Sequence, residues 1–511
     1  MKHKNPGRSL IYSAKNKLAF AFILFFLFFS CKNDNVLQPS FETHNFFDLS
    51  NNDIFLIKVN TSSRVVRAAN TGSVLGSFPD YQNIRPVVRA ELDDNTRPPI
   101  GHPAAREFSA NPPPIIEEIS PRLQSLSAFV PPGVGDQRMF LVETFLGSGR
   151  FEEQRATLKA YGTHGNIWVM DNVRTPLPEG RAKELARRFD LIYPRATAIL
   201  GYEYGGGPGG NGGRDRDPRI QILVYDILDR NGTVAAGGFF WGKDWFPRSQ
   251  IPSSNEAEIF YIDTSQVIRF PDFAAAILVH ELQHMINWNM KFVRHGRNSA
   301  AWYNEMLSAM AEDIILPMVG VGAYNRYHPI NQRLRLFLAT YHERGVTEWH
   351  NQLACYSRVF GFGAYLLRNF GGADLLRRIL HNNTVNEASI TAALPPGITF
   401  EIALIRFGEA LVFSGDYFPP HRASFDRTDG NTIIYRNNER WTYTAYGFNI
   451  MGFFNSQYSR GAYIHNLTPR DMRPHSIVVQ SSDAWRNITG DFSITLEKPH
   501  NGNIMMYLLV R

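Results

Sequence analysis

Three residues near the middle of the chain, His280, Glu281 and His284, have side chains and a spacing that suit metal chemistry. Residues 273–288 are predicted to form a helix, because a proline and an aspartate precede them and Ala and Leu fill the first turns. On a helix, positions four apart share a face, so both imidazoles can reach one ion. Glu281 lies about 100° around the axis, where its carboxylate can face a water on that ion. Zinc lowers the pKa of such a water to about 7, and the carboxylate can then take its proton.

The sequence around this pattern supports a metal site. The alternative is a pair of unrelated surface or core histidines, and a chance match has a probability on the order of a few per cent in a chain of this His content. Against that alternative, residues 258–263 predict a strand before the helix, and residues 301–313 predict a second helix that ends before Pro317. A catalytic zinc ion needs three protein ligands and one open position, and the second helix can supply the third ligand.

Glu305, in the second predicted helix, is the preferred third ligand. Glu312 lies seven residues further along the same helical face; it could bind the metal, but an orienting contact to a histidine suits it better. Asp313 points elsewhere on the helix. His295 would be the ligand of a more compact pattern, but that pattern needs Gly and His at two positions that hold Asn and Met in this chain.

The two segments resemble the hyicolysin family of neutral zinc metallopeptidases, which groups with the thermolysin-like zincins. The strings that carry the resemblance are His-Glu-Leu-Gln-His-Met-Ile-Asn-Trp at 280–288 and Trp-Tyr-Asn-Glu-Met-Leu-Ser-Ala-Met-Ala-Glu at 302–312. Looser similarity lies at 237–244 and 360–371, within a span of about 160–380.

The resemblance implies that both histidines and Glu305 bind zinc and that Glu281 is the catalytic acid and base. In thermolysin-like enzymes, an Asp four positions after the ligand Glu supports a histidine. Ala309 occupies that position here, so the support must come from elsewhere, and Glu312 is the candidate.

Such enzymes also use a Tyr or His donor to stabilise an oxyanion, and a strand near the active helix to bind the substrate backbone. Tyr356 is the preferred donor, because it lies just before a helix in the region expected to face the zinc. His328, Tyr324 and Tyr303 are the alternatives. The Gly-rich strand predicted at 233–241 is assigned the substrate-binding role.

The Gly-rich segment 205–217 predicts a loop. Its Asn211, Asp215 and Asp217 offer hard oxygens that suit calcium, although a flexible surface loop without metal is the favoured interpretation. No Gly-Lys-Ser/Thr ends the segment, so it is not a phosphate-binding loop.

Residues 1–30 resemble an export signal. Five Lys and Arg residues lie before or at the start of an apolar run at 18–29 that is too short to span a bilayer. Cys31 follows Phe-Phe-Ser, as in a relaxed bacterial lipoprotein signal that is cleaved before a lipidated cysteine. We therefore expect an exported cell-envelope lipoprotein held to a membrane by lipid on Cys31. The alternative is an ordinary secretory signal with an incidental cysteine.

The basic net charge gives no indication of nucleic-acid binding. The chain has 53 Lys and Arg against 47 Asp and Glu, a formal charge of +6. Residues 1–30 hold five of the basic groups and no acidic one, which leaves 48 against 47, or +1. No basic-aromatic stripe is present. With Cys31 lipidated, Cys355 has no disulfide partner, and no signature of a thiol enzyme surrounds it.

The patterns along the chain predict an α+β protein. Residues 31–50 are expected to be a polar tether, and residues 51–155 a β-rich region whose Pro-rich linker, at 97–115, is extended and exposed. Residues 156–400 are expected to be a zincin-like domain with a mixed sheet and active-site helices. Short alternating runs at 405–511 predict a C-terminal β-sandwich-like domain.

These observations together favour a zinc-dependent endopeptidase that acts on proteins or peptides. The main alternative is a surface lipoprotein, an adhesin, with a structural or vestigial zinc site. Glu281 argues against it, because a structural site is closed by four ligands and does not need that carboxylate. A zinc aminopeptidase is disfavoured, because no Gly-x-Met-Glu-Asn string is present.

Overall fold

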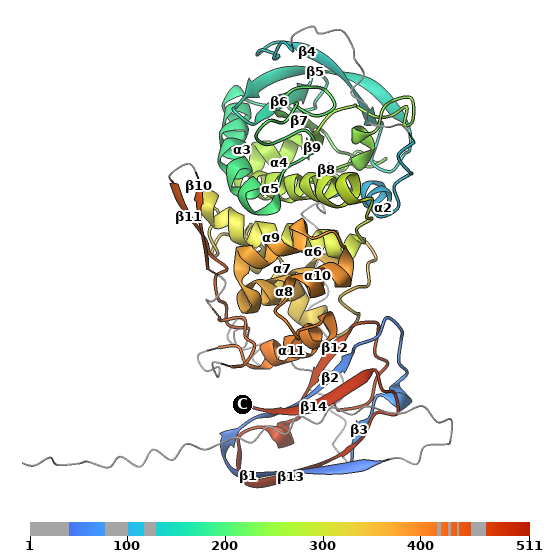
Figure 1. The fold of residues 1–511 in the computed structure, drawn as a ribbon, viewed down its shortest axis with the longest axis vertical. Helices are drawn as coiled ribbons and strands as arrows, with labels where there is room; N and C mark the ends of the chain where they lie inside the picture. Colours follow the sequence, from blue (N-terminus) through green and yellow to red (C-terminus); the bar gives the residue numbers. More distant parts are fainter. Residues whose placement is uncertain are drawn as a thin grey trace, which may run out of the picture. The chain divides into compact units, whose positions relative to one another are not determined.

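A six-stranded mixed sheet carries the helices of the predicted metal site in the computed structural model (Figure 1). Its order is β4-β5-β6-β7-β9-β8, which makes β8 an edge strand. β6, β7 and β9 run parallel, whereas the β4–β5, β5–β6 and β8–β9 pairs are antiparallel. The strands are β4 (Gln137–Glu143), β5 (Phe151–Tyr161), β6 (Gly165–Met170), β7 (Ile220–Tyr225), β8 (Gly238–Phe240) and β9 (Ile259–Asp263).

The structure describes residues 40–76, 101–116, 129–415, 421–427, 431–436, 439–450 and 467–511. The predicted signal segment and Cys31 lie outside these residues. Among the described helices, none is both long and apolar enough to cross a membrane. The α+β class predicted from the sequence is confirmed.

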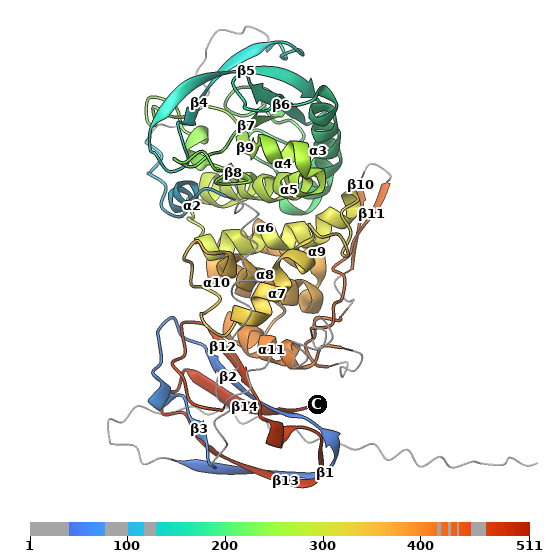
Figure 2. The ribbon, with the colours of Figure 1, turned by 180° about the vertical axis from the view of Figure 1, so that it is seen from behind.

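Two layers of helices lie below the six-stranded sheet in the views of Figures 1 and 2. Helices α3 (Glu179–Leu200) and α5 (Pro271–Asn287) pack against each other and the sheet, and α6 (Ala301–Ile315) packs between α5 and α8 (Leu353–Phe370). The other helices are α4 (Thr264–Arg269), α7 (Pro329–Thr340), α9 (Gly372–His381), α10 (Asn386–Ala393) and α11 (Phe400–Val412). Short helical turns are η1 (Ala68–Asn70), η2 (Gly242–Trp245), η3 (Trp288–Val293), η4 (Leu316–Val319) and η5 (Asp483–Trp485).

The predicted site helices are confirmed as α5 and α6. Every residue of α5 from Phe273 to Asn287 is buried, as is every residue of α6 from Trp302 to Ile315. Helices that are buried on all sides belong to the core, and charged side chains on them must find partners inside the protein.

Segments near both ends of the described chain combine into two three-stranded sheets. β2 lies between β12 and β14, and β13 lies between β1 and β3, with every pair antiparallel. The Tyr507 hydroxyl of β14 donates to the Ile405 carbonyl of α11 at 2.7 Å, so the β12-β2-β14 sheet also contacts the helices. The strands are β1 (Phe41–Asn52), β2 (Ile54–Asn60), β3 (Ser73–Val74), β12 (Ile477–Gln480), β13 (Ile488–Glu497) and β14 (Ile504–Val510).

This strand pairing corrects two predictions. Residues 41–50, expected within a polar tether, form most of β1, whose partner β13 lies near the other end of the chain. Residues 405–511 do not fold as a domain of their own, because α11 continues to Val412 and β12, β13 and β14 pair with the N-terminal strands. The hairpin of β10 (Thr432–Arg436) and β11 (Glu439–Tyr443) does pair within that range.

Two helix boundaries also differ from expectation. The pattern of residues 179–192, followed by Pro194, predicts a helix that stops before the proline. The helix instead continues through Pro194 to Leu200, because burial of its apolar face outweighs the backbone hydrogen bond that proline removes. The pattern of residues 362–381 predicts a single helix, but these residues belong to two helices, α8 and α9. They are separated by Gly371, whose φ of 105° ends a helix and suits glycine.

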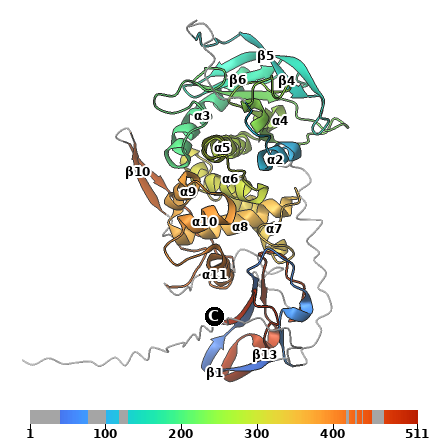
Figure 3. The ribbon, with the colours of Figure 1, turned by 45° about the vertical axis from the view of Figure 1, so that its right-hand side comes forward.

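The Pro-rich segment is not extended throughout. Residues Pro103–Ala110 form helix α2, which begins after the His102 cap and buries Ala105 and Arg106. The prediction of an exposed linker is wrong for these residues, because the proline stands at the first helical position, where it is tolerated. Helix α2 contacts η2 and α6, and Figure 3 shows it near α6.

Candidate metal centre

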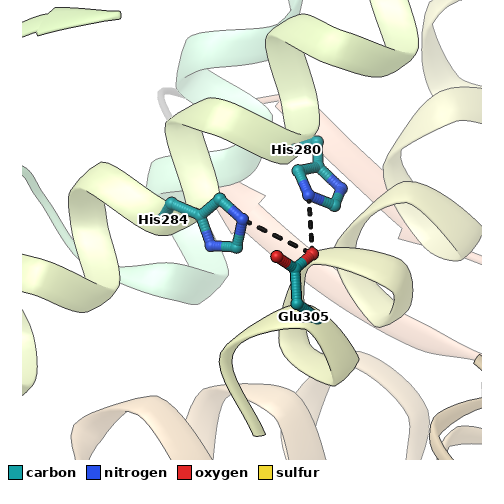
Figure 4. A group of neighbouring side chains, drawn as sticks. All are labelled: His280, His284 and Glu305. Carbon is teal, nitrogen blue, oxygen red and sulfur yellow. Dashed lines mark hydrogen bonds and ion pairs between the residues drawn. The ribbon is translucent and has the colours of Figure 1, made fainter. Parts of the chain in front are cut away.

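Helices α5 and α6 bring His280, His284 and Glu305 together (Figure 4). We call these three residues the metal group, and their ligand atoms all lie within 4.8 Å of one another. Glu305 Oε2 lies 3.0 Å from His280 Nε2 and 3.7 Å from His284 Nε2. Two imidazole nitrogens and one carboxylate oxygen are a donor set of catalytic zinc sites, so the residues present fit that ion.

Glu312 contacts the opposite nitrogen of His280. Its Oε1 lies 2.7 Å from His280 Nδ1, and Arg333 Nη2 donates to the same carboxylate at 2.9 and 3.3 Å. Burial would lower the pKa of His280, but its bonds to Glu305 and Glu312 raise it to about 10. Burial would raise the pKa of Glu312, but the charge of Arg333 and the bond to His280 lower it. If His280 binds a metal through Nε2, its Nδ1–H donates to an ionised Glu312.

Ser308 contacts the other histidine. Its Oγ lies 3.2 Å from His284 Nδ1, and its hydroxyl donates to Gln283 Oε1. Ser308 follows Glu305 by about one helical turn, so α6 supplies both a ligand and a contact for a second ligand. Ser308 was not predicted from the sequence, although its spacing from Glu305 could have indicated it. Arg333 was not predicted either, because it comes from α7 and has no local signal.

Glu281 contacts the edge strand of the sheet. The Phe240 N–H of β8 donates to Glu281 Oε2 at 2.7 Å. Its Oε1 is buried and has no hydrogen-bond partner among the described residues. Burial raises the pKa of Glu281, although the charges of His280 and His284 oppose the change. Beside the metal group, a carboxylate that keeps one oxygen without a hydrogen-bond partner is placed to accept a proton.

Tyr356, on α8, is connected to the group through Arg106. Arg106 Nη1 donates to the Tyr356 hydroxyl at 2.7 Å, and Arg106 Nε lies 3.6 Å from Glu305 Oε1. Burial raises the pKa of Tyr356 well above its usual value, so this hydroxyl keeps its proton and can donate. Arg106 was not predicted from the sequence, because it comes from α2, within the segment interpreted as a linker.

The other residues considered as ligands or donors lie outside this group. His328 caps the start of α7, and Tyr303 donates its hydroxyl to a serine of α10. Asp313 forms a buried ion pair with an arginine of α8 at 2.6 Å. His295 and Tyr324 are exposed.

The oxygens considered for calcium have protein partners. Asp215 Oδ2 lies 2.9 Å from Arg138 Nη1, and Asp217 Oδ1 accepts from Arg219 Nε at 3.2 Å. Asn211 Oδ1 accepts from the backbone N–H two residues later at 3.1 Å. Each contact also accounts for the local shape of the loop, and calcium binding stays a prediction.

Comparison with known proteins gives one informative similarity. No protein-family model matches the chain. The neutral metalloprotease ShpI of Staphylococcus hyicus is 26% identical over 281 residues, which cover 50% of this chain and 57% of ShpI. The chain therefore spans less than two thirds of that relative. The similarity supports a metallopeptidase family for this chain at a general level, and the narrower hyicolysin assignment stays a prediction.

Proposed function

We propose that the chain is a zinc-dependent endopeptidase held to the bacterial cell envelope by a lipid on Cys31. One observation supports the hydrolase above all: Glu281 lies beside a group of three potential ligands and has an open carboxylate oxygen. A structural zinc site would be closed by a fourth ligand, and Glu281 does not belong to the ligand group. The similarity to a neutral metalloprotease points in the same direction.

The chain's own residues suit peptide hydrolysis. Zinc held by His280, His284 and Glu305 would supply Lewis acidity. Glu281 takes a proton from the attacking water, whose oxygen bonds to the carbonyl carbon, and later gives that proton to the departing amine as the C–N bond breaks. The Phe240 N–H holds Glu281 in place. The Tyr356 hydroxyl is proposed to donate to the carbonyl oxygen as negative charge develops on it.

The edge strand β8 is proposed to bind the substrate backbone. It pairs with β9 on one side, and its N–H of Phe240 already contacts Glu281. An extended peptide added beside such an edge is aligned by main-chain hydrogen bonds, with the side chains left to determine preference. This geometry suits cleavage within a chain, and mapping the cleaved ends would separate endopeptidase from aminopeptidase activity.

The central experiment replaces Glu281 with Gln in the full chain. The expected result is one zinc per chain, as in the wild type, with hydrolysis of a fluorogenic peptide reduced by roughly 10²–10⁴-fold. Glu179→Gln makes the same exchange on an exposed residue of α3 and should leave the rate unchanged. Hydrolysis by the Glu281→Gln protein at the wild-type rate would reject the mechanism.

The lipid anchor has a separate test. Growth with labelled palmitate should label the wild-type protein, and Cys31→Ser should abolish the label and release the protein from the membrane fraction. The sequence before Cys31 supports this proposal. A Cys31→Ser protein that still carries the label would reject it.

A further inference from the structure

The proposed catalytic groups are closed off in this structure. His280 and Glu281 are each 0% exposed, and Glu305 is 1% exposed. The neighbouring Tyr356 is 4% exposed. A peptide must come within bonding distance of these groups to be cut, so some part of the chain must give way.

Helix α2 and the residue before its cap lie where an incoming peptide would bind. The Gly101 N–H donates to the Gly238 carbonyl of β8 at 2.8 Å, on the side of that strand away from β9. This is the kind of main-chain hydrogen bond that a substrate strand would make with the edge of the sheet. The φ of Gly101 is +99°, so the chain turns away from the edge immediately into α2.

Further along α2, Arg106 fills the space beside the metal group. Its guanidinium donates to the Tyr356 hydroxyl at 2.7 Å and lies 3.6 Å from Glu305 Oε1. It therefore engages the hydroxyl proposed to stabilise the substrate oxyanion. Ser109, one turn further, lines a small cavity together with His284. Helix α2 thus lies near Glu305 through Arg106 and lines a cavity beside His284 through Ser109.

Besides Arg106, contacts of the His102 cap and of Phe108 hold α2 in place. His102 Nδ1 accepts from the Ala104 N–H, so its Nε2–H donates to Glu143 Oε2 at 2.7 Å. Phe108 packs against Phe246, with ring centres 5.8 Å apart. A helix of eight residues is not stable in isolation, so α2 keeps its shape only while these contacts persist.

From this geometry we propose that residues Gly101–Ala110 occupy the substrate-binding surface and compete with the substrate for it. This proposal rests on the proposed peptidase function. The surface consists of the outer edge of β8, the Tyr356 hydroxyl and Glu305 Oε1. The substrate must displace α2, and weakening the contacts of Arg106 raises the fraction of molecules open to substrate.

The first test compares Arg106→Gln with Glu107→Gln in the full, zinc-loaded chain. Glu107 is exposed on the same helix, which makes it the matched control. The expected result is a rise of at least about tenfold in kcat/KM for a peptide in Arg106→Gln and no change in Glu107→Gln. Adding Glu281→Gln to Arg106→Gln should abolish the gain, which shows that the same site is responsible.

The outcomes separate this inference from the function on which it rests. If the wild type is active and Arg106→Gln has an equal or lower kcat/KM, the inference is overturned and the peptidase function stands. Arg106 would then not hinder substrate binding. If the wild type and Arg106→Gln are both folded and zinc-loaded and neither cuts peptides, the peptidase function and the inference are rejected together.

Hydrogen exchange of the wild-type chain tests the displacement without relying on hydrolysis or on a variant that must fold. Backbone amides of α2 should exchange at least about tenfold faster than those of α5, because α2 opens without global unfolding. A peptide hydroxamate bound at the zinc should raise exchange in α2 further. Equal protection of α2 and α5, or reduced exchange of α2 with the inhibitor, would overturn the proposal.

Discussion

The metal group has two sides that are built differently. On the side of His280 Nδ1, Glu312 lies at 2.7 Å and Arg333 completes an ion pair with it at 2.9 Å. On the side of Glu305 Oε1, Arg106 approaches to 3.6 Å. Both sides place an arginine beside a carboxylate of α6, but the first arginine makes two hydrogen bonds to its carboxylate and the second makes none.

We interpret Arg333 as a permanent support of the metal group and Arg106 as a contact that a substrate can replace. Arg333 belongs to α7, a helix of 12 residues packed against α8 in the main core. Arg106 belongs to an eight-residue helix, which is too short to keep its shape without its contacts to the rest of the protein. Variants on the two sides should therefore differ in kind, with stability and metal affinity affected on the Glu312 side and access to the site affected on the Arg106 side.

The largest effect is expected from Arg333→Met, which leaves Glu312 buried without its cation. Breaking a buried ion pair in this way destabilises proteins by about 3–5 kcal/mol. Urea unfolding of the zinc-loaded chain measures the change. Arg335→Met, on the exposed face of the same helix, should change stability by less than about 0.5 kcal/mol. Equal effects of the two variants would remove the proposed distinction between the two sides.

Glu312→Gln should have the second-largest effect, which is a loss of affinity for zinc. The amide keeps the size of the side chain but weakens the acceptor for His280 Nδ1–H and the ion pair with Arg333. Loss of such a partner lowers metal affinity by about 10–100-fold. Competition with a zinc chelator measures that affinity. Unchanged affinity would mean that the contact positions α7 rather than the metal ligand.

Ser308→Ala should have a smaller effect on the same measurement. It removes the neutral oxygen that lies 3.2 Å from His284 Nδ1. A neutral partner is weaker than a carboxylate, so we expect affinity for zinc to fall only about three- to tenfold. Alanine is a good helix former, so α6 should persist. A loss as large as that of Glu312→Gln would show that the two histidines depend equally on their partners.

Asn351→Gly should have the smallest effect, a minor change in stability, and it tests how firmly Arg106 is held. Asn351 Oδ1 accepts from Arg106 Nε at 3.3 Å, and its backbone φ of 55° is readily adopted by glycine. Because Asn351 is exposed, water can replace its oxygen, and stability should change by less than about 1 kcal/mol. Thermal unfolding measures this. A larger loss of stability would show that the Asn351 oxygen, which also accepts from Trp349 Nε1 at 2.6 Å, holds the Arg106 side more firmly than proposed.

The part of the site encoded by short-range spacing could be predicted from the sequence. The histidines are four positions apart on one buried helix, and Glu305 and Glu312 lie seven apart on the next, so helical geometry alone determines which side chains share a face. The strand predicted at 258–263 is likewise confirmed as β9, a buried and mostly apolar run of the kind that parallel strands require.

The remainder depends on contacts between distant segments, which local patterns do not encode. Arg106 reaches Glu305 across a long separation in sequence, from a segment whose prolines suggested an exposed linker. The polar pattern of β1 does not reveal its pairing with β13. The continuation of α3 through Pro194 is decided by packing, which outweighs the local preference of proline.

The place of β2 has a consequence for synthesis of the protein. β2 is completely buried and pairs on both edges, with β12 and β14, which the ribosome makes long after β2. Until then, this seven-residue strand, which is apolar except for Lys58 and Asn60, has neither neighbour, and such strands pair readily with other chains. A nascent chain halted before residue 477 would therefore need a chaperone to shield this strand from aggregation.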